Sequence, residues 1–321
     1  MPKVFVDWLN GGYRRVLAAG LEFLGPATGL RPGVRVAVKP NLTFPHFRPG
    51  VMTTLEAIQA VVEGLREYTD TISICEADSG GYNRFCVEDV FRATGLDDLA
   101  RRYGIRLLNL SRLPQQRIRV PTRWRRLEVP LPAWLLHEVD LLVTVPVPKV
   151  HANTVLSGAV KNQWGVIPDP TVRLRLHPCF SAVIWAIHQA LPRTLVVMDG
   201  RWGLNRNGPM RGEPVELNWL LVSDSVLFAD LAMAELLGFS PRQVPHLREG
   251  CRRQGVRSLA EAECNRQLDE FRKAPFRLER AWTDLPGWLA FRWRSLAWLA
   301  YESPFAQLLH RMLYLVREPF Y

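Results

Sequence analysis

Short apolar runs rich in β-branched residues recur along the first two thirds of the chain, and each has the length of a buried strand. They cover residues 3–6, 34–38, 71–75, 105–108, 139–145, 194–198 and 216–222. Between strands the apolar positions follow the helical period: Leu55, Ile58, Val61 and Leu65 share one face of a predicted helix over residues 55–68. Strands that alternate with amphipathic helices are typical of parallel βαβ units. We therefore expect an α/β fold with a mostly parallel sheet and flanking helices.

Two segments depart from this alternation. Residues 111–132 are rich in arginine and proline and contain short β-type pieces, which predicts either a hairpin excursion or a basic surface for a partner. After Gly250 the pattern changes to helical segments dense in arginine and tryptophan. We therefore divide the chain into an α/β domain, residues 1–250, and a helical C-terminal region, residues 251–321.

The end of the C-terminal region, residues 285–321, mixes tryptophan and leucine with charged residues. Charges at Arg292, Arg294, Glu302 and Arg311 interrupt it before any apolar run reaches about 18 residues, so it is not a membrane-spanning helix. Three interpretations remain open: packing on the chain's own core, docking on a membrane surface, or docking on a protein partner. A homo-oligomer is one form of the last.

Composition limits the classes of partner. The chain has 321 residues, 48% of them hydrophobic, enough for one large core or two smaller ones. Its formal net charge of +10 predicts an anionic partner: a small molecule, a lipid surface or a nucleic acid. Nucleic acid is disfavoured, because the basic residues 112–126, which include Trp124, match no RNA-recognition, KH, helix-turn-helix or zinc-finger pattern.

The cysteines indicate a reducing environment. None forms a CxxC pair, and their spacing fits neither a zinc site nor an iron–sulfur cluster, so we expect reduced, structural thiols and no such cluster. They are Cys75, Cys86, Cys179, Cys251 and Cys264. Residues 1–15 lack the basic end, apolar core and cleavage site of a secretory signal. We expect a cytoplasmic protein, with a peripheral position at a membrane as the alternative.

The segment of residues 139–169 places polar side chains beside a buried strand. Residues 139–145 form an apolar run with one threonine, and the prolines that follow end it. Lys149 and His151 therefore come directly after a strand's carboxyl end. In open α/β sheets that is where ligands bind, so this segment is the first candidate for a functional site.

A short helix is predicted after this loop. Asn153 or Thr154 can cap it, and Asn153, Ser157 and Lys161 stand four residues apart, which places an amide, a hydroxyl and an ammonium on one helix face. Apolar residues on the other faces favour a partly dry environment for the ammonium. The alternative interpretation is that the lysines of this segment are solvated and its histidine is structural.

Polar residues follow other predicted strands in the same way. Lys39 and Asn41 come after the second strand, Glu76 and Asp78 after the third, and Asp199 after the sixth. Because these strand ends lie at one edge of a parallel sheet, we expect a shared pocket. Its carboxylates would orient the lysines or hold a divalent cation. Taken singly, each loop is also compatible with an ordinary solvated connection.

Three more residues complete the candidate set. Asn162 continues the first segment, and His177 either joins the pocket or merely precedes the helix predicted from Phe180. Asp230 stands inside an apolar helix over residues 226–237, where an unpaired carboxylate is costly. We expect Asp230 to hold a lysine or loop amides in place.

The motifs that the chain lacks narrow the reaction classes. It contains no GxGxxG or GxxxxGK[ST] sequence for nucleotide phosphates, no GxSxG nucleophile turn and no HExxH metal helix. Its cysteines stand in no recognisable protease context. These observations disfavour nucleotide-dependent and standard hydrolytic mechanisms.

The candidate loops resemble those of the family called domain of unknown function 362. The matching pieces are VAVKPNLT at 36–43, ICEADSGG at 74–81, PKVHANTVLSGAVKNQWG at 148–165, His177, VVMDG at 196–200, GPMRGEP at 208–214 and SDSVLFAD at 223–230. Many members of that family carry a separate ferredoxin-like segment with clustered cysteines, and some are iron–sulfur proteins. This chain has no such cluster.

The histidine, turn and lysine of the first segment also show a distant similarity to the nickel-dependent lactate racemase family. There, a lysine anchors a nickel pincer cofactor and histidines handle the proton on the α-carbon. The corresponding positions are His151 and Lys161, with Ser157-Gly158-Ala159 in place of a double glycine. The resemblance implies a scaffold suited to small α-substituted carboxylates.

Together these observations predict an enzyme for an anionic metabolite, a carboxylate or a phosphate, acting by proton transfer or redox chemistry. The predicted catalytic residues are His151, Lys161 and Lys149, with His151 preferred for proton transfer because its ordinary pKa lies near neutrality. The predicted substrate-binding residues are Lys39, Asn41, Asn153, Asn162 and His177. The alternative is a non-catalytic binding or assembly protein that docks on a membrane or partner through residues 285–321.

Overall fold

The structure is a computed structural model that describes residues 1–79, 85–122, 126–273 and 275–316. Some residues named above lie outside the described ranges: Gly80 and Gly81 of the ICEADSGG piece, Trp124 of the basic residues 112–126, and the last five residues of the C-terminal region.

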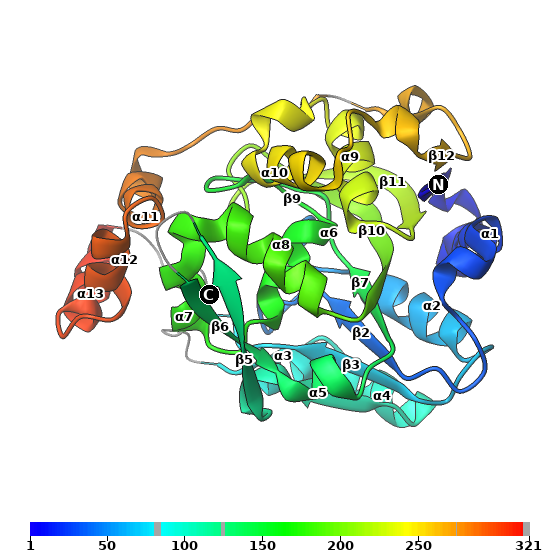
Figure 1. Ribbon diagram of the computed structural model, residues 1–321, viewed down its shortest axis with the longest axis horizontal. Helices are drawn as coiled ribbons and strands as arrows, with labels where there is room; N and C mark the ends of the chain where they lie inside the picture. Colours follow the sequence, from blue (N-terminus) through cyan, green and yellow to red (C-terminus); the bar gives the residue numbers. More distant parts are fainter. Residues whose placement is uncertain (80–84, 123–125, 274, 317–321) are drawn as a thin grey trace.

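A ten-stranded sheet forms the centre of the molecule (Figure 1). Its order is β12, β1, β11, β10, β7, β2, β3, β4, with β8 joined to β10 and β9 joined to β8. The bounds are β1 (Lys3–Trp8), β2 (Val36–Pro40), β3 (Ile72–Glu76), β4 (Arg106–Asn109), β7 (Leu141–Val145), β8 (Lys149–His151), β9 (Val155–Ser157), β10 (Arg193–Asn205), β11 (Glu213–Ser223) and β12 (Glu263–Cys264). Strands β10, β7, β2, β3 and β4 are parallel, whereas β11 runs antiparallel to β10 and β1. The predicted, mostly parallel α/β fold is confirmed.

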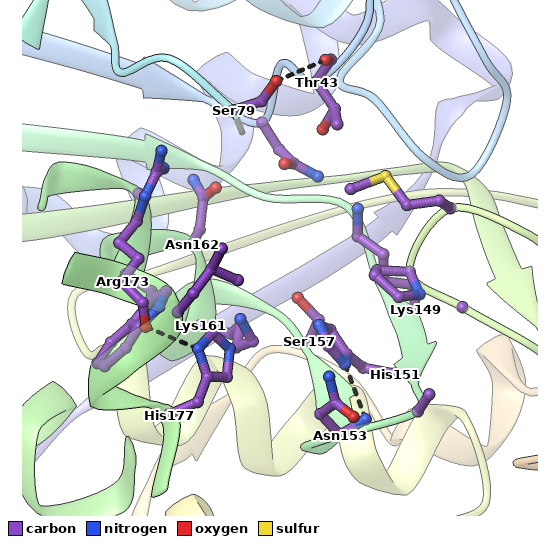
Figure 2. A pocket seen from close by; sticks show the side chains of 18 of the residues that line it. Thr43, Ser79, Lys149, His151, Asn153, Ser157, Lys161, Asn162, Arg173 and His177 are labelled. Carbon is purple, nitrogen blue, oxygen red and sulfur yellow. Dashed lines mark hydrogen bonds between the residues drawn. The ribbon is translucent and has the colours of Figure 1, made fainter. Parts of the chain in front are cut away.

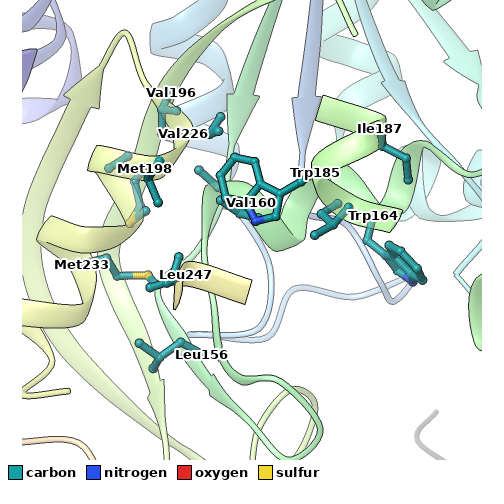
Figure 3. Close-up of a cluster of buried hydrophobic side chains, with 14 of the residues drawn as sticks. Leu156, Val160, Trp164, Trp185, Ile187, Val196, Met198, Val226, Met233 and Leu247 are labelled. Atoms are coloured by element: carbon teal, nitrogen blue, oxygen red, sulfur yellow. The ribbon is translucent and has the colours of Figure 1, made fainter. Parts of the chain in front are cut away.

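Helices cover both faces of the sheet. Their bounds are α1 (Gly12–Leu24), α2 (Leu55–Leu65), α3 (Val87–Ala93), α4 (Leu96–Tyr103), α5 (Ala133–His137), α6 (Ala159–Asn162), α7 (Pro170–Leu176), α8 (Phe180–Ala190), α9 (Val226–Leu236) and α10 (Pro245–Gln254). Along β7, Leu142 joins one buried cluster while Leu141 and Val143 join the other, since successive strand residues point to opposite faces. The cluster with Leu142 lies under α8, α9 and α10 and includes Trp185 and Met233 (Figure 3). This packing holds the strand ends that carry the candidate residues.

The arginine- and proline-rich segment forms a hairpin beside the main sheet. Strands β5 (Gln115–Pro121) and β6 (Arg126–Pro132) pair antiparallel and make no ladder with the ten-stranded sheet. Val120, Leu127, Val129 and Leu131 are buried on its inner side. The hairpin excursion predicted for residues 111–132 is therefore confirmed.

The helix predicted from Asn153 through Lys161 is wrong. Strands β8 and β9 form a hairpin there, and Val155 has a left-handed φ of 70°. Strand β10 runs on past its predicted end, and Leu204 of this extension pairs with Lys149. The extended ladder draws residues 149–157 into β structure, and only the short helix α6 follows. Asn153, Ser157 and Lys161 therefore share no helix face.

The C-terminal region divides between two places. Strand β12 pairs with β1 at the edge of the main sheet. Helices α11 (Leu285–Ala290), α12 (Arg294–Tyr301) and α13 (Ala306–Val316) form an arm at the other end of the molecule, against α7 (Figure 1). Among the helices of the described ranges, none has both the length and the apolar character needed to cross a bilayer. The division at residue 250 stays a prediction.

Candidate functional site

A cavity of about 370 Å³ lies at the carboxyl ends of the parallel strands. Figure 2 shows Lys161, Arg173 and His177 on one side of it, Lys149 and His151 on another, and Thr43 with Ser79 across from them. The predicted residues that line it are Lys39, Asn41, Glu76, Lys149, His151, Asn153, Lys161, Asn162 and His177. The strand-end loops therefore do converge on one cavity. Asp78, Asp199 and Asp230 are not among its described lining residues.

Lys39 and Glu76 form a buried ion pair in the cavity wall. Their Nζ and Oε2 atoms are 2.9 Å apart, and the two side chains are only 1% and 5% exposed. Asn162 fixes the strand end from which the lysine comes, since its Nδ2 donates to the Lys39 carbonyl at 3.1 Å and to Thr144 Oγ1 at 2.8 Å. A Cβ on Gly165 would stand 2.8 Å from Lys39 Nζ, so this position needs a glycine. The Glu76 carboxylate therefore compensates the charge of the Lys39 ammonium.

Lys149 is buried and Lys161 is partly buried, and neither has a carboxylate partner among the described residues. The Lys149 ammonium donates to the Val51 carbonyl at 2.7 Å, and the Lys161 ammonium lies 5.1 Å from the centre of the Phe180 ring. Burial, together with the charge of Lys161, lowers the pKa of Lys149 to about 7. Burial, together with the charge of Arg173, likewise lowers the pKa of Lys161 to about 7. Both amines are therefore poised to gain or lose a proton near neutrality.

Arg173 and Trp164 belong to the cavity but escape the sequence reasoning. The Arg173 guanidinium is buried and donates to the Asp78 carbonyl, and burial lowers its pKa. Trp164 is buried, and its indole N–H has no acceptor among the described residues. Both come from the segment after Lys161, where apolar spacing indicates a core helix and gives no sign of a donor aimed at a ligand. Arg173 adds a guanidinium to the cavity wall, and Trp164 adds an indole ring.

The two histidines of the cavity are neutral and differ in tautomer. His151 Nδ1 accepts from the Asn153 N–H at 3.1 Å, which leaves the proton on Nε2. His177 Nδ1 lies 2.8 Å from the Arg173 carbonyl and must donate to it, which leaves a lone pair on Nε2. Burial holds the pKa of His151 well below its ordinary value and lowers that of His177 to about 3. The expectation that His151 titrates near neutrality is therefore wrong.

Asp230, one of the predicted supporting carboxylates, holds two backbone amides in place. Asp230 accepts from the amides of Ala159 and Val160 at 2.6 and 3.0 Å, which is the amide-holding role considered for it. A Cβ on Gly158 would lie 2.3 Å from Asp230 Oδ1, so a glycine is required there. Burial raises the pKa of Asp230 to about 7.

Asp78 and Asp199 contact helix starts rather than lysines. Asp199 accepts from Tyr13 Oη and from both the amide and the hydroxyl of Thr54, the cap residue of α2. Asp78 accepts from the Val87 amide at the start of α3. The prediction that Asp78 and Asp199 orient the lysines is therefore wrong, because their carboxylates accept hydrogen bonds from the starts of α3 and α2 instead.

Several of the side chains around the cavity that could bind a metal ion are engaged in other contacts. Within the described residues, no group of three or more histidine, cysteine, aspartate and glutamate side chains is placed to hold a metal ion. Glu76 is paired with Lys39, and His151 uses its free lone pair on a backbone amide. The Asp284 carboxylate accepts from Asn207 Nδ2 at 2.8 Å. The possible divalent metal site stays a prediction.

The C-terminal arm supplies one wall of the cavity. Trp288, Phe291 and Tyr301 line it. The Phe291 ring lies 4.3 Å from the His177 ring and stacks on Tyr301 at 6.0 Å. An ion pair at 3.3 Å between Arg175 of α7 and Glu302 holds the arm in place. The interpretation that this region packs on the chain's own body therefore holds for one side of it.

Fold and cavity together define an α/β protein with a basic pocket at its strand ends. A profile of the family described as Domain of unknown function (DUF362) matches residues 36–235, and the chain belongs to this family. The match covers all of the candidate strand-end loops and leaves the C-terminal arm outside it.

Two further comparisons give more distant relatives. The chain is 24% identical over 248 residues to a thylakoid-associated protein of Synechocystis sp., which covers 72% of each. Among solved structures, it is similar to the lactate racemase apoprotein from Thermoanaerobacterium thermosaccharolyticum, with a TM-score of 0.44 and 15% identity, and to a protein from Thermotoga maritima, with a TM-score of 0.41 and 12% identity. The likeness covers 73% and 70% of this chain, but only 56% and 58% of those two.

Proposed function

We propose that this protein is an enzyme that binds a small anion in the cavity and moves a proton on it. The observation that carries the proposal is a set of three basic side chains in the cavity wall, of which Lys149 and Arg173 are buried and Lys161 is partly buried. None of the three has an ion-pair partner among the described residues. Holding such charges away from water is costly unless an anion arrives to compensate them. A carboxylate or phosphate oxygen supplies that compensation.

The neighbouring donors suit the same ligand. The Nε2–H of His151 and the indole N–H of Trp164 are hydrogen-bond donors in the cavity wall. Charge-assisted hydrogen bonds from such fixed groups are about twice as strong as neutral ones. We assign anion binding to Lys149 and Arg173, and orientation of the anion to His151 and Trp164. Lys39 keeps its charge engaged with Glu76 and supports the wall.

Lys161 is our choice for proton transfer. With its pKa lowered to about 7, a substantial fraction of the amine is neutral at physiological pH and able to take a proton. Bound anion charge would stabilise the protonated form, so the amine becomes a stronger base when substrate is present. His177 lies on the same side of the cavity as Lys161, and its Nε2 lone pair offers a second proton acceptor. The step proposed is removal and return of a proton beside the anionic group.

Anion binding by purified protein tests this proposal. Calorimetric titration with sulfate and with acetate covers the tetrahedral and the planar oxyanion. Lys149→Met should weaken binding of the preferred anion by about tenfold or more, because a buried charge-assisted contact contributes about 1.5–3 kcal/mol. Lys273→Met, at an exposed lysine, is the matched control and should bind normally. Equal affinity in all three proteins would refute the role of the cavity.

Exchange of a carbon-bound hydrogen tests the reaction itself. Small carboxylates incubated with the protein in deuterium oxide should gain deuterium next to the carboxyl group, and Lys161→Met should abolish that gain while Lys273→Met preserves it. Exchange that survives in Lys161→Met assigns the base elsewhere.

We also propose that the enzyme works at a membrane surface on the cytoplasmic side. The support comes from the thylakoid-associated relative. Fractionation of cells that express the full chain tests this setting: the protein should distribute to the membrane fraction and be released by high salt. If all of the protein is found in the soluble fraction at low salt, the proposed membrane setting is contradicted.

A further inference from the structure

The outer side of the C-terminal arm exposes large apolar side chains in a helical row. Leu308, Leu309, Met312 and Leu315 of α13, with Phe305 directly before its first residue, recur at intervals of three and four residues, which is the spacing of one helix face. They are between 38% and 85% exposed. In a helix that packs on its own protein, such a row faces inward. We call these five residues the exposed stripe.

The inner side of α13 is accounted for by the arm itself. Ala306 is buried, and His310 Nε2 lies 3.1 Å from the Ala300 carbonyl, with its ring 5.4 Å from that of Tyr301. Helix α13 therefore packs on α12 through its other face, and the stripe is left outward. Trp293 and Trp298 of the α12 segment are also more than half exposed. Apolar surface on this scale is unusual in a lone soluble protein and marks a docking surface.

The charges around the stripe indicate what docks on it. Residues 285–316 contain three arginines, Arg292, Arg294 and Arg311, and all three are exposed. Their one acidic residue, Glu302, points inward to the ion pair with Arg175. Exposed tryptophan, leucine and arginine in residues 285–316, with Glu302 paired to Arg175, fit the headgroup and upper acyl region of an anionic bilayer.

We propose that helices α11 to α13 dock the protein on a bilayer surface that contains anionic lipids. The stripe and the exposed tryptophans enter the headgroup region, and the arginines contact lipid phosphates. This inference rests on the membrane setting proposed above and is independent of the anion chemistry in the cavity. It also gives the arm a second task, because the inward residues Trp288, Phe291 and Tyr301 of the same helices wall the cavity. Docking therefore places that wall directly behind the lipid surface.

Vesicle sedimentation of the full chain tests the proposal. The protein should sediment with phosphatidylcholine vesicles that contain phosphatidylglycerol, bind weakly to phosphatidylcholine alone, and be released as salt screens the arginines. The double variant Leu308→Ser with Met312→Ser should lose about tenfold or more in vesicle affinity, because two apolar side chains no longer leave water. Tyr68→Ser removes an exposed aromatic residue at the end of α2, away from the arm, and should bind vesicles as the unchanged protein does.

A charge variant separates the lipid contribution from misfolding. Arg294→Gln with Arg311→Gln should weaken binding to phosphatidylglycerol vesicles several-fold, with little effect on binding to phosphatidylcholine alone. Anion titration of every variant without vesicles reports on the cavity, so a loss of vesicle binding with intact anion binding supports docking by the arm. Vesicle binding that the stripe variant leaves unchanged overturns the inference. The inference is also overturned if the unchanged protein binds no vesicles and instead forms a dimer that dissociates in the stripe variant.

Discussion

The cavity and the C-terminal arm reverse the usual distribution of polar and apolar groups in opposite ways. In the cavity, Lys149 and Arg173 are buried although they carry basic groups, and Lys161 is partly buried beside them. On the arm, residues such as Leu308 and Leu315 are exposed although they are apolar. Neither arrangement favours the folded, isolated chain, since one loses hydration of charge and the other leaves apolar surface in water. Each makes sense when an outside partner completes it, an anion in one case and a bilayer in the other.

The buried carboxylates Asp230 and Asp199, elsewhere in the body, provide a contrast to the cavity. Both have full sets of donors: Asp230 holds two amides and Asp199 holds the start of α2. A buried polar group with partners stabilises the fold, whereas one without partners needs a separate explanation, of which a ligand is one. The predictions below separate these two kinds of buried charge and then compare both with the arm.

The largest effect is expected at Asp230. Asp230→Ala leaves the amides of Ala159 and Val160 buried without an acceptor, which should lower the free energy of unfolding by about 3 kcal/mol. Urea denaturation followed by circular dichroism measures this. Asp70→Ala, at a side chain that is 91% exposed, serves as the control and should change stability by less than about 0.5 kcal/mol. A loss below about 1 kcal/mol at Asp230 would show that its contacts are not structural.

Lys161→Met should act in the opposite direction. Replacing this partly buried ammonium, which has no carboxylate partner among the described residues, by an apolar side chain of similar length should raise the free energy of unfolding by about 1–2 kcal/mol. The same urea experiment, done without added anions, gives the sign. Lower stability in Lys161→Met would place this lysine among the structural charges.

The pH dependence of that gain follows from the lowered pKa of Lys161. An unfolded lysine takes up its proton below about 10.5, but the folded one does so only below about 7. The folded protein therefore loses stability as pH falls through this window, and Lys161→Met removes the loss. The advantage of the variant should be near zero above pH 10.5 and larger by about 1 kcal/mol or more at pH 7. An advantage that stays constant with pH is incompatible with a titrating Lys161.

The smallest effect is expected on the arm. Leu308→Ser changes a side chain that is 56% exposed, so the free energy of unfolding should shift by no more than about 0.5 kcal/mol. Leu156→Ala, at a fully buried leucine of the body, should cost about 2–5 kcal/mol. Thermal melts of both variants compare the two regions directly. A loss at Leu308 close to that at Leu156 would mean that the stripe is covered within the free protein.

The sequence predicts the central strands of the sheet well because each of them is marked by an apolar run in its own residues. The apolar runs at 34–38 and 71–75 appear as β2 and β3 within about two residues, and their polar ends converge because parallel strands share an edge. What fails is a decision that depends on distant residues. The spacing of Asn153, Ser157 and Lys161 suits a helix, but the extension of β10 to Asn205 takes this stretch into a ladder.

The chemistry of the site is harder to predict for the same reason. Nothing near His151 in the sequence reveals that the Asn153 amide occupies its Nδ1 or that burial lowers its pKa. Phe291 and Tyr301 reach the cavity from more than a hundred residues away, through packing of α12 on α7. The arginines and tryptophans of residues 285–316 predict a docking surface, but only the fold shows which of their faces remains outward.

The most direct test follows the titration of Lys161 by nuclear magnetic resonance of protein labelled at lysine Cε, with Lys161→Met used to assign the signal. In protein free of anions, the signal should titrate near pH 7, and saturation with sulfate or acetate should move its pKa up toward the ordinary value of a lysine. A signal that titrates near 10.5 without anions, or one that neither anion shifts, would contradict the assignment of this cavity as an anion site with a titrating base.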